Sequence, residues 1–192
     1  MKRLLLILIL TFSFQAWTKA DDIRDFEIEG MSVGDSLLDF FSLNSIEDNI
    51  ISDYNDNEYS RVNLRLKNFN DFENLQFHIK TKDKKYIIHA LSGGQFYDDI
   101  NKCYSKMKIM DKEIQNVLSD VDRQDFWTQE HPADSKSTYK SIYYFLPSGD
   151  GFRLACFDWS DKMTEKNNWI DHIKVSAFTN DITTWFDEKA YK

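Results

Sequence analysis

The chain has 192 residues, of which 24 are basic and 32 are acidic, so its formal net charge is −8 at pH 7. This acidic balance, without a stripe of clustered Lys and Arg, argues against a nucleic-acid-binding protein, because phosphate contacts need such clusters. The length suits one domain with its own hydrophobic core. After the first twenty residues, no segment is apolar enough to predict a membrane span.

The first twenty residues have the pattern of a signal peptide. Lys2 and Arg3 precede an apolar run over 4–14, and residues 18–20 (TKA) fit a small-x-small cleavage site. The run is shorter than the ~20 residues of a membrane-spanning helix, and a buried N-terminal helix is the alternative. Cleavage would remove three basic residues and no acidic one, which leaves 21 basic against 32 acidic and a net charge of −11. We therefore expect a periplasmic or secreted mature chain at 21–192, with no cysteine at its start for a lipid anchor.

Two short helices are expected early in the mature chain, one over 36–42 that is capped by Asp35 and one over 45–51. The polar loop that follows begins like an EF-hand. However, Glu58 stands where that loop needs Gly, and Leu64 stands where it needs Glu. The sequence therefore predicts no calcium site here, and we expect no other metal and no cofactor.

Three segments, at 59–66, 74–80 and 85–91, alternate apolar and polar side chains with the period of two that marks half-buried strands. Three more strand candidates lie at 139–146, 152–159 and 169–178. Between the third and the fourth, a long helix is expected over about 98–121, because apolar side chains recur there at helical spacing. The polar segment 122–138, with Pro132 inside it, is expected to be irregular, and a short helix at 181–191 ends the chain.

This order of elements, without βαβ alternation, predicts an α+β fold. We expect a largely antiparallel sheet of about six strands in two three-stranded meanders, packed against the long central helix and shorter terminal helices. All of it would form a single domain, 21–192. The portions at about 30–95 and 98–192 both run from helix to strands, which leaves open a degenerate tandem repeat.

The mature chain has two cysteines, Cys103 and Cys156. An even number in an exported protein predicts a disulfide, and two separate buried thiols are the alternative. A bridge would close a loop of about 50 residues, worth roughly 4 kcal/mol by the chain-entropy argument. Cys103 lies on the apolar stripe of the long helix, and Cys156 alternates with Phe152 and Leu154 on its strand. A bridge would therefore tie the helix to the second half of the sheet.

The pentapeptide at 30–34 (GMSVG) has the G-x-S-x-G form of a hydrolase nucleophile elbow, with Ser32 at its centre. Such an elbow follows a strand and needs an oxyanion hole from an earlier loop. Only about nine mature residues precede Gly30, too few to supply either. We therefore favour a bend in which Gly30 and Gly34 supply flexibility, and we predict no catalytic residue.

One predicted surface has a charge opposite to that of the whole protein. If the first three strands form a meander, one face carries basic side chains, and we name it the basic face: Arg61, Arg65, His78, Lys80, Lys85 and His89. An ordinary solvated face is one interpretation. The other is a site for a small anionic ligand or an acidic protein partner. The many Tyr and Trp residues of the second half either line a pocket or fill the core.

Three stretches together carry a resemblance: FEIEGMSVGDSLLDFFS, KYIIHALSGGQFYDDINKCY and CFDWSDKMTEKNNWIDHIKVS. They resemble a group of small exported proteins from marine bacteria with AT-rich genomes, which implies export and lends no catalytic residue. Separately, GMSVGDSLLDFF, with the second helix and three strands, looks like the helix-helix-sheet unit of outer-membrane assembly lipoproteins and of tandem-repeat β-lactamase inhibitor proteins. That likeness implies protein binding, although the lipidated cysteine is missing.

The leading hypothesis is thus an exported, non-catalytic binding or protein-interaction module. The alternatives are a small serine hydrolase that uses Ser32 and a small-ligand carrier with an aromatic-lined pocket. The sequence does not identify the ligand, the partner or the oligomeric state.

Overall fold

The computed structural model describes residues 22–65, 71–118 and 120–192, so the predicted signal peptide lies outside the described residues. Its centre is one antiparallel sheet with the strand order β1-β2-β3-β4-β8-β7-β6-β5. The strands are β1 (Ile50–Ile51), β2 (Tyr59–Leu64), β3 (Asn74–Lys80), β4 (Ile88–Phe96), β5 (Asp122–His131), β6 (Asp134–Phe145), β7 (Gly151–Asp158) and β8 (His172–Phe178).

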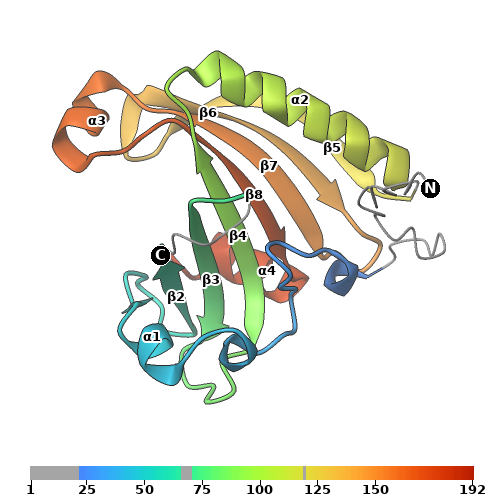
Figure 1. Cartoon of the computed structure of the whole chain (residues 1–192), viewed down its shortest axis with the longest axis vertical. Helices are drawn as coiled ribbons and strands as arrows, with labels where there is room; N and C mark the ends of the chain where they lie inside the picture. The colour runs from blue at the N-terminus through green and yellow to red at the C-terminus, as the bar shows by residue number, and fades with distance from the viewer. Residues whose placement is uncertain (1–21, 66–70, 119) are drawn as a thin grey trace, which may run out of the picture.

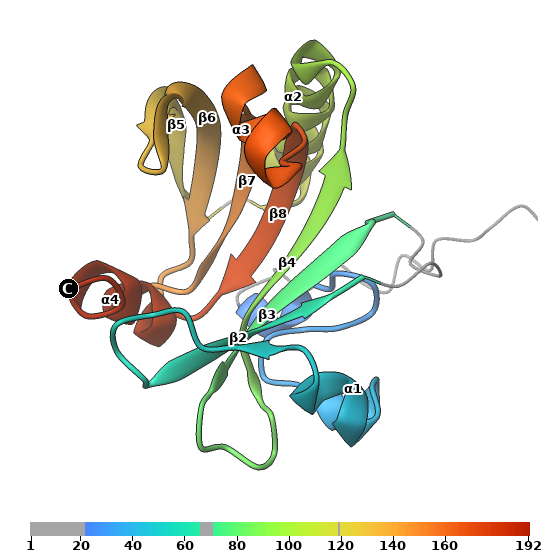
Figure 2. The same cartoon turned by 90° about the vertical axis from the view of Figure 1, so that its left-hand side faces the viewer.

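Helices lie on both sides of this sheet, which curves strongly (Figures 1 and 2). The helices are α1 (Leu43–Glu47), α2 (Ile100–Val117), α3 (Asp161–Asn167) and α4 (Asn180–Glu188), with the 3-10 turns η1 (Ile23–Asp25) and η2 (Leu37–Asp39). The convex side carries α1 and α2, and the concave side carries α4 (Figure 2). We call these sides the outer and the inner face.

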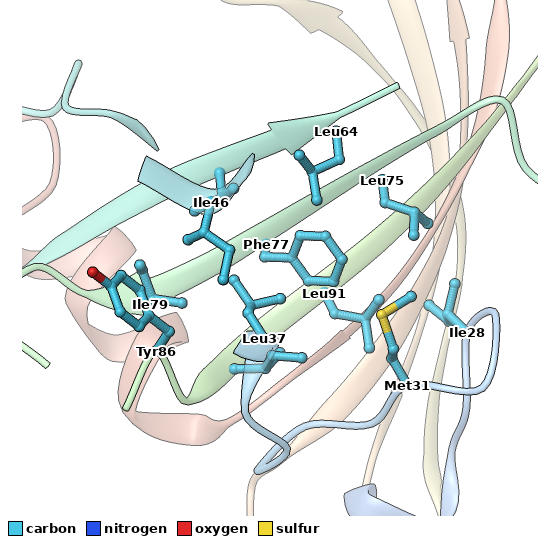
Figure 3. Close-up of a cluster of buried hydrophobic side chains, with 12 residues drawn as sticks. Ile28, Met31, Leu37, Ile46, Leu64, Leu75, Phe77, Ile79, Tyr86 and Leu91 are labelled. Carbon is cyan, nitrogen blue, oxygen red and sulfur yellow. The ribbon is translucent and has the colours of Figure 1, made fainter. Parts of the chain in front are cut away.

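The outer face of β2, β3 and β4 is apolar because alternate side chains of each strand point the same way. Phe77, Leu75 and Leu91 are fully buried there. They pack against Leu37 and Ile46 from the segment with η2 and α1 (Figure 3). Fully burying one such side chain contributes about 1.5–3 kcal/mol. This cluster therefore fixes the N-terminal segment on the sheet.

The outer face of the second half of the sheet is covered by α2. Cys103 and Met107 of the helix are fully buried against Leu154 and Cys156 of β7 and Ile173 of β8. Cys103 and Cys156 form a disulfide with Cα atoms 6.0 Å apart. The predicted bridge between the long helix and the second half of the sheet is confirmed.

The α+β class and the antiparallel sheet are confirmed, but the prediction of about six strands is wrong. In the part of the chain that the structure describes, eight strands form a single sheet, in which the β1–β4 meander and the β5–β8 meander meet where β4 pairs with β8. The segment expected to be irregular instead supplies β5 and the start of β6, with Pro132 in the turn between them. An edge strand has only one neighbouring strand and buries few side chains, so the polar sequence of β5 has no apolar alternation that would predict a strand. The tandem repeat stays a prediction.

The helices of the structure differ from the predicted ones in where they end and in one capping residue. The long helix is 18 residues and ends at Val117, four residues before the predicted end. Ser36, and not Asp35, caps η2, with its hydroxyl accepting from the N–H of Leu38. The helix α3 was not predicted, because only Met163 of its seven residues is buried and no apolar stripe marks it.

Candidate functional site

The inner face of the sheet carries polar and aromatic side chains in rows that run across the strands. The antiparallel register aligns three successive rows. The first holds Asn63, Gln76, Ser92, Ser176, Arg153 and Tyr143; the second holds Asn74, Gly94, Lys174, Ala155 and Ser141; the third holds Phe96, His172, Phe157 and Tyr139. Since neighbouring strands lie ~4.8 Å apart, each row is a continuous surface.

Lys174 of β8 lies at the centre of the second row. Its ammonium donates a hydrogen bond of 2.7 Å to Oε1 of Gln76, and in the described part of the chain no carboxylate lies within ion-pair distance of it. Burial, together with the positive charges of Arg153 and Arg61, lowers the pKa of Lys174 to about 7. The side chain is only half-buried, so a ligand can still reach it. A lysine held so far below its ordinary pKa, without a counter-charge, is typical of a functional site.

Arg153 of β7 is the second cation of this region. Its Nε and Nη2 both donate to the hydroxyl of Ser141, at 2.9 and 2.6 Å. The guanidinium also lies over the rings of Tyr139 and Tyr143, with its central carbon 5.2 and 5.1 Å from their centroids. Burial lowers the pKa of Arg153. Among the described residues, it too has no carboxylate partner, so its charge is balanced only by hydroxyl and ring contacts.

Trp127 of β5 closes the side of this region. Its ring stacks on Tyr143 at a centroid distance of 5.7 Å and an interplanar angle of 14°. Its indole N–H is buried and has no hydrogen-bond acceptor among the described residues. A buried donor without an acceptor costs about 1–3 kcal/mol and calls for an explanation, such as an absent ligand or water.

The third row continues into an aromatic cluster at the α3 end of the inner face. We define the aromatic cluster as His131, Tyr139, Phe157, Trp159, Trp169 and His172, all of them half-buried. Phe157 lies nearly parallel to His172, at 4.9 Å and 15°, and to Trp159, at 5.8 Å and 13°. His131 approaches Trp159 edgewise at a centroid distance of 4.5 Å, and Trp169 lies tilted against Trp159 at 4.4 Å. The indole N–H of Trp159 is also buried without an acceptor in the described chain.

The α4 end of the inner face is closed by packing. Tyr59, Ala90 and Phe178 are buried against Ile182 and Trp185 of α4. The open part of the face therefore runs from the row with Arg153 to the aromatic cluster.

The predicted basic face is divided by the structure. Arg61 pairs in register with His78, and both lie on the inner face in the row next to Asn63 and Gln76. Arg61 forms an ion pair of 2.7 Å with Asp53. His78 is buried, and its Nε2 forms a 2.7 Å hydrogen bond with the Tyr54 hydroxyl. Burial lowers the pKa of His78 to about 3. It is therefore uncharged at neutral pH.

The other members of the basic face lie toward its rim. Lys80 is exposed at the end of β3, 5.9 Å above the ring of Tyr59. His89 contacts the same ring, and burial lowers its pKa. Arg65 and Lys85 are exposed outside the strands. The structure thus does not gather these six residues into one patch.

Sequence reasoning missed both Lys174 and Arg153. A signal was present: each is the single Lys or Arg of its strand segment, in HIKVSAF and in FRLACF. A charged residue within such a strand either faces solvent or belongs to a functional site. Only the sheet register shows that Lys174 and Arg153 lie in adjacent rows.

Ser32 is buried in the loop before η2. Its hydroxyl donates 3.0 Å to the carbonyl of Phe26, and its N–H donates 2.8 Å to the carboxylate of Asp35. Gly30 and Gly34 have positive φ angles of 74° and 95°, as the predicted bend requires. No histidine hydrogen bond to Ser32 is found among the described residues. The pentapeptide has the geometry of a turn.

Two surface hollows lie away from the inner-face cations. One, of about 480 Å³, is lined by Tyr97, Lys102 and neighbouring residues at the start of α2. The other, of about 200 Å³, is lined by Glu58, Trp185 and residues around them. Neither brings together buried charged groups, so we centre the candidate site on Lys174 and Arg153.

Within the described ranges, no group of three or more His, Cys, Asp or Glu side chains is arranged to hold a metal ion. Over the same residues, no helix has the length and apolarity needed to cross a membrane.

Comparisons of the chain with protein-family models, curated proteins and solved structures found no match.

Proposed function

We propose that this protein is a non-catalytic binding module that holds a small organic anion on the inner face of its sheet. The observation that carries the proposal is the pair Lys174 and Arg153, two half-buried cations in adjacent rows with no carboxylate partner in the described chain. A bound carboxylate, sulfonate or phosphate would supply the missing negative charge. The gain is large because the pair is already partly desolvated.

The hydrogen-bonding groups around the two cations suit an anion. Arg153 has five N–H donors, and its contacts to Ser141 leave others free for a planar oxyanion. Ser92 donates to Ser176 at 2.9 Å, so the hydroxyl hydrogen of Ser176 is itself left as a donor. Lys174 adds a mobile point charge.

We place the protein in the periplasm or outside the cell, in line with the sequence prediction. The Cys103–Cys156 bridge supports this, because disulfides persist mainly in oxidising compartments. The hydrolase alternative receives no support from the hydrogen bonds of Ser32.

Titration with the fluorescent anion 8-anilinonaphthalene-1-sulfonate tests the proposal. We expect saturable binding at one site, weakened by salt and reduced about tenfold by Lys174→Met or Arg153→Gln, since each removes a charged hydrogen-bond donor. Lys108→Met, which removes an exposed lysine of α2, is the matched control and should bind as the wild type does. An affinity for the fluorescent anion that neither Lys174→Met nor Arg153→Gln changes would contradict the proposal.

The same titration has a defined pH dependence. The affinity for the anion should be constant below pH 7 and fall as the pH rises above about 7, because Lys174 then loses its proton before the ligand binds. Lys174→Met should abolish this fall.

A further inference from the structure

The aromatic cluster lies immediately beside the two cations. Lys174 and His172 are two residues apart on β8 and lie on the same face, so their Cα atoms are separated by ~7 Å. Arg153 and Phe157 lie on the same face of β7, four residues apart. A small molecule with its anionic group at the cations would therefore extend over the rings.

We propose, on the basis of the proposed anion site, that the ligand also carries a flat aromatic ring, which the aromatic cluster holds. The ligand class is thus an aryl acid, whose charge is bound by Lys174 and Arg153 and whose ring contacts Phe157, His172 and Trp159.

The geometry of the rings supports a flat partner. Tyr139, Phe157 and His172 project from three neighbouring strands with interplanar angles of 28° and 15°. Their parallel orientation allows a further ring to pack in an offset-stacked or edge-to-face arrangement. All three remain half-buried, so part of each ring faces outward.

The charges of the site select among ring-bearing ligands. Burial lowers the pKa of His172 to about 4, and burial also lowers the pKa of His131, so at neutral pH the aromatic cluster carries no positive charge of its own. A cationic ring, such as a quaternary ammonium compound, would be repelled by Lys174 and Arg153. A neutral ring attached to an acid satisfies both regions.

The buried donor of Trp159 is a second and independent observation. Its indole N–H has no acceptor among the described residues. The N–H of Trp127 is in the same state beside Tyr143, which contacts Arg153. Buried donors without an acceptor call for an explanation, and an oxygen atom of a bound molecule at each indole N–H would supply one.

The test compares 3-phenylpropanoate with 3-cyclohexylpropanoate by isothermal titration calorimetry on the full mature chain. The two acids share charge, chain length and ring size, and only the first has a flat π-system. We expect 3-phenylpropanoate to bind about threefold to tenfold more tightly. Phe157→Leu or Trp159→Leu should remove most of this preference, whereas Phe186→Leu, which removes a half-buried ring of α4, should preserve it.

The outcomes separate this inference from the proposed function. Equal affinities of the wild-type protein for the two acids, both reduced by Lys174→Met, would overturn the aromatic preference and leave the anion site standing. Affinities that Lys174→Met leaves unchanged, or no binding of either acid, would overturn both. The wild-type comparison needs no variant to fold, and urea unfolding of each variant confirms that its sheet is intact.

Discussion

Replacing Lys174 by Met should stabilise the protein while it weakens anion binding. In the folded chain the charged ammonium is partly desolvated, and the positive charges of Arg153 and Arg61 add to that cost. Methionine keeps a flexible apolar stem of similar length and removes the charge. The charged side chain of Lys174 is thus expected to lower the stability of the fold, as is common for groups that serve binding.

The magnitude follows from the pKa of Lys174. A fall from 10.5 to about 7, at 1.36 kcal/mol for each pKa unit, gives an upper limit of about 5 kcal/mol. The side chain is only half-buried, so solvent screening reduces this limit, and about 2–3 kcal/mol is a realistic destabilisation. Losing the hydrogen bond to Gln76 offsets about 1 kcal/mol. The net stabilisation of Lys174→Met at pH 6 should therefore be about 1–2 kcal/mol.

The pH dependence gives the sign of the effect. The folded pKa of Lys174 lies below its unfolded value, so between about pH 7 and 10.5 the unfolded chain binds more protons than the folded chain. The contribution of Lys174 to stability is therefore least favourable below pH 7 and improves as the pH rises through this window. The advantage of Lys174→Met over the wild type should shrink to zero or reverse by pH 10.

Urea unfolding of both proteins at pH 6 and pH 10 measures this difference, and other titrating groups cancel between them. Lys108→Met is the control, with no expected change in stability beyond ~0.5 kcal/mol. If Lys174→Met is less stable than the wild type at pH 6, or if the difference is the same at both pH values, the charge of Lys174 does not destabilise the folded protein.

Two further predictions concern what holds α2 on the sheet. Replacing Cys103 and Cys156 together by Ala should lower the free energy of unfolding by about 4 kcal/mol, as expected for a cross-link between residues 53 apart; a loss below about 1 kcal/mol in urea unfolding would contradict this. Asp111→Ala should cost about 2–4 kcal/mol, because Arg123 and the Tyr144 hydroxyl both donate to this buried carboxylate. Burial alone would raise the pKa of Asp111, but the hydrogen bonds have the larger effect and the pKa is lowered. The contribution of Asp111 to stability is therefore present above about pH 4 and lost as the pH falls further. A difference in unfolding free energy between wild type and Asp111→Ala that stays constant from pH 7 to 3 would count against this prediction.

The features that the sequence predicted correctly depend on local patterns. The period-two alternation of β2 and β3 and the helical stripe of α2 identify elements because one face of each must be apolar to be buried. The same stripe placed Cys103 toward the sheet, and the alternation of Cys156 with Phe152 and Leu154 placed its partner there. The positive φ angles of Gly30 and Gly34 likewise follow from residue type.

Errors arose where an element buries little. The edge strand β5 is polar, and α3 buries only Met163, so neither has a pattern to detect. A register shift between His78 and Ile79 also places Ile88 on the outer face and Ala90 on the inner face, although simple alternation puts them together.

The sequence by itself determined the α+β class, the long helix, the bend around Ser32 and the bridged cysteines, because each rests on interactions that repeat along the chain or on residue chemistry. Only the tertiary structure decided the candidate site. Lys174 and Arg153 are 21 positions apart, and Gln76 is 98 positions from Lys174. They meet because β8 joins β4 on one side and β7 on the other, a pairing set by the packing of both halves of the sheet. Burial and neighbouring charge then lower the pKa of Lys174, and both are properties of the assembled sheet that no local pattern contains.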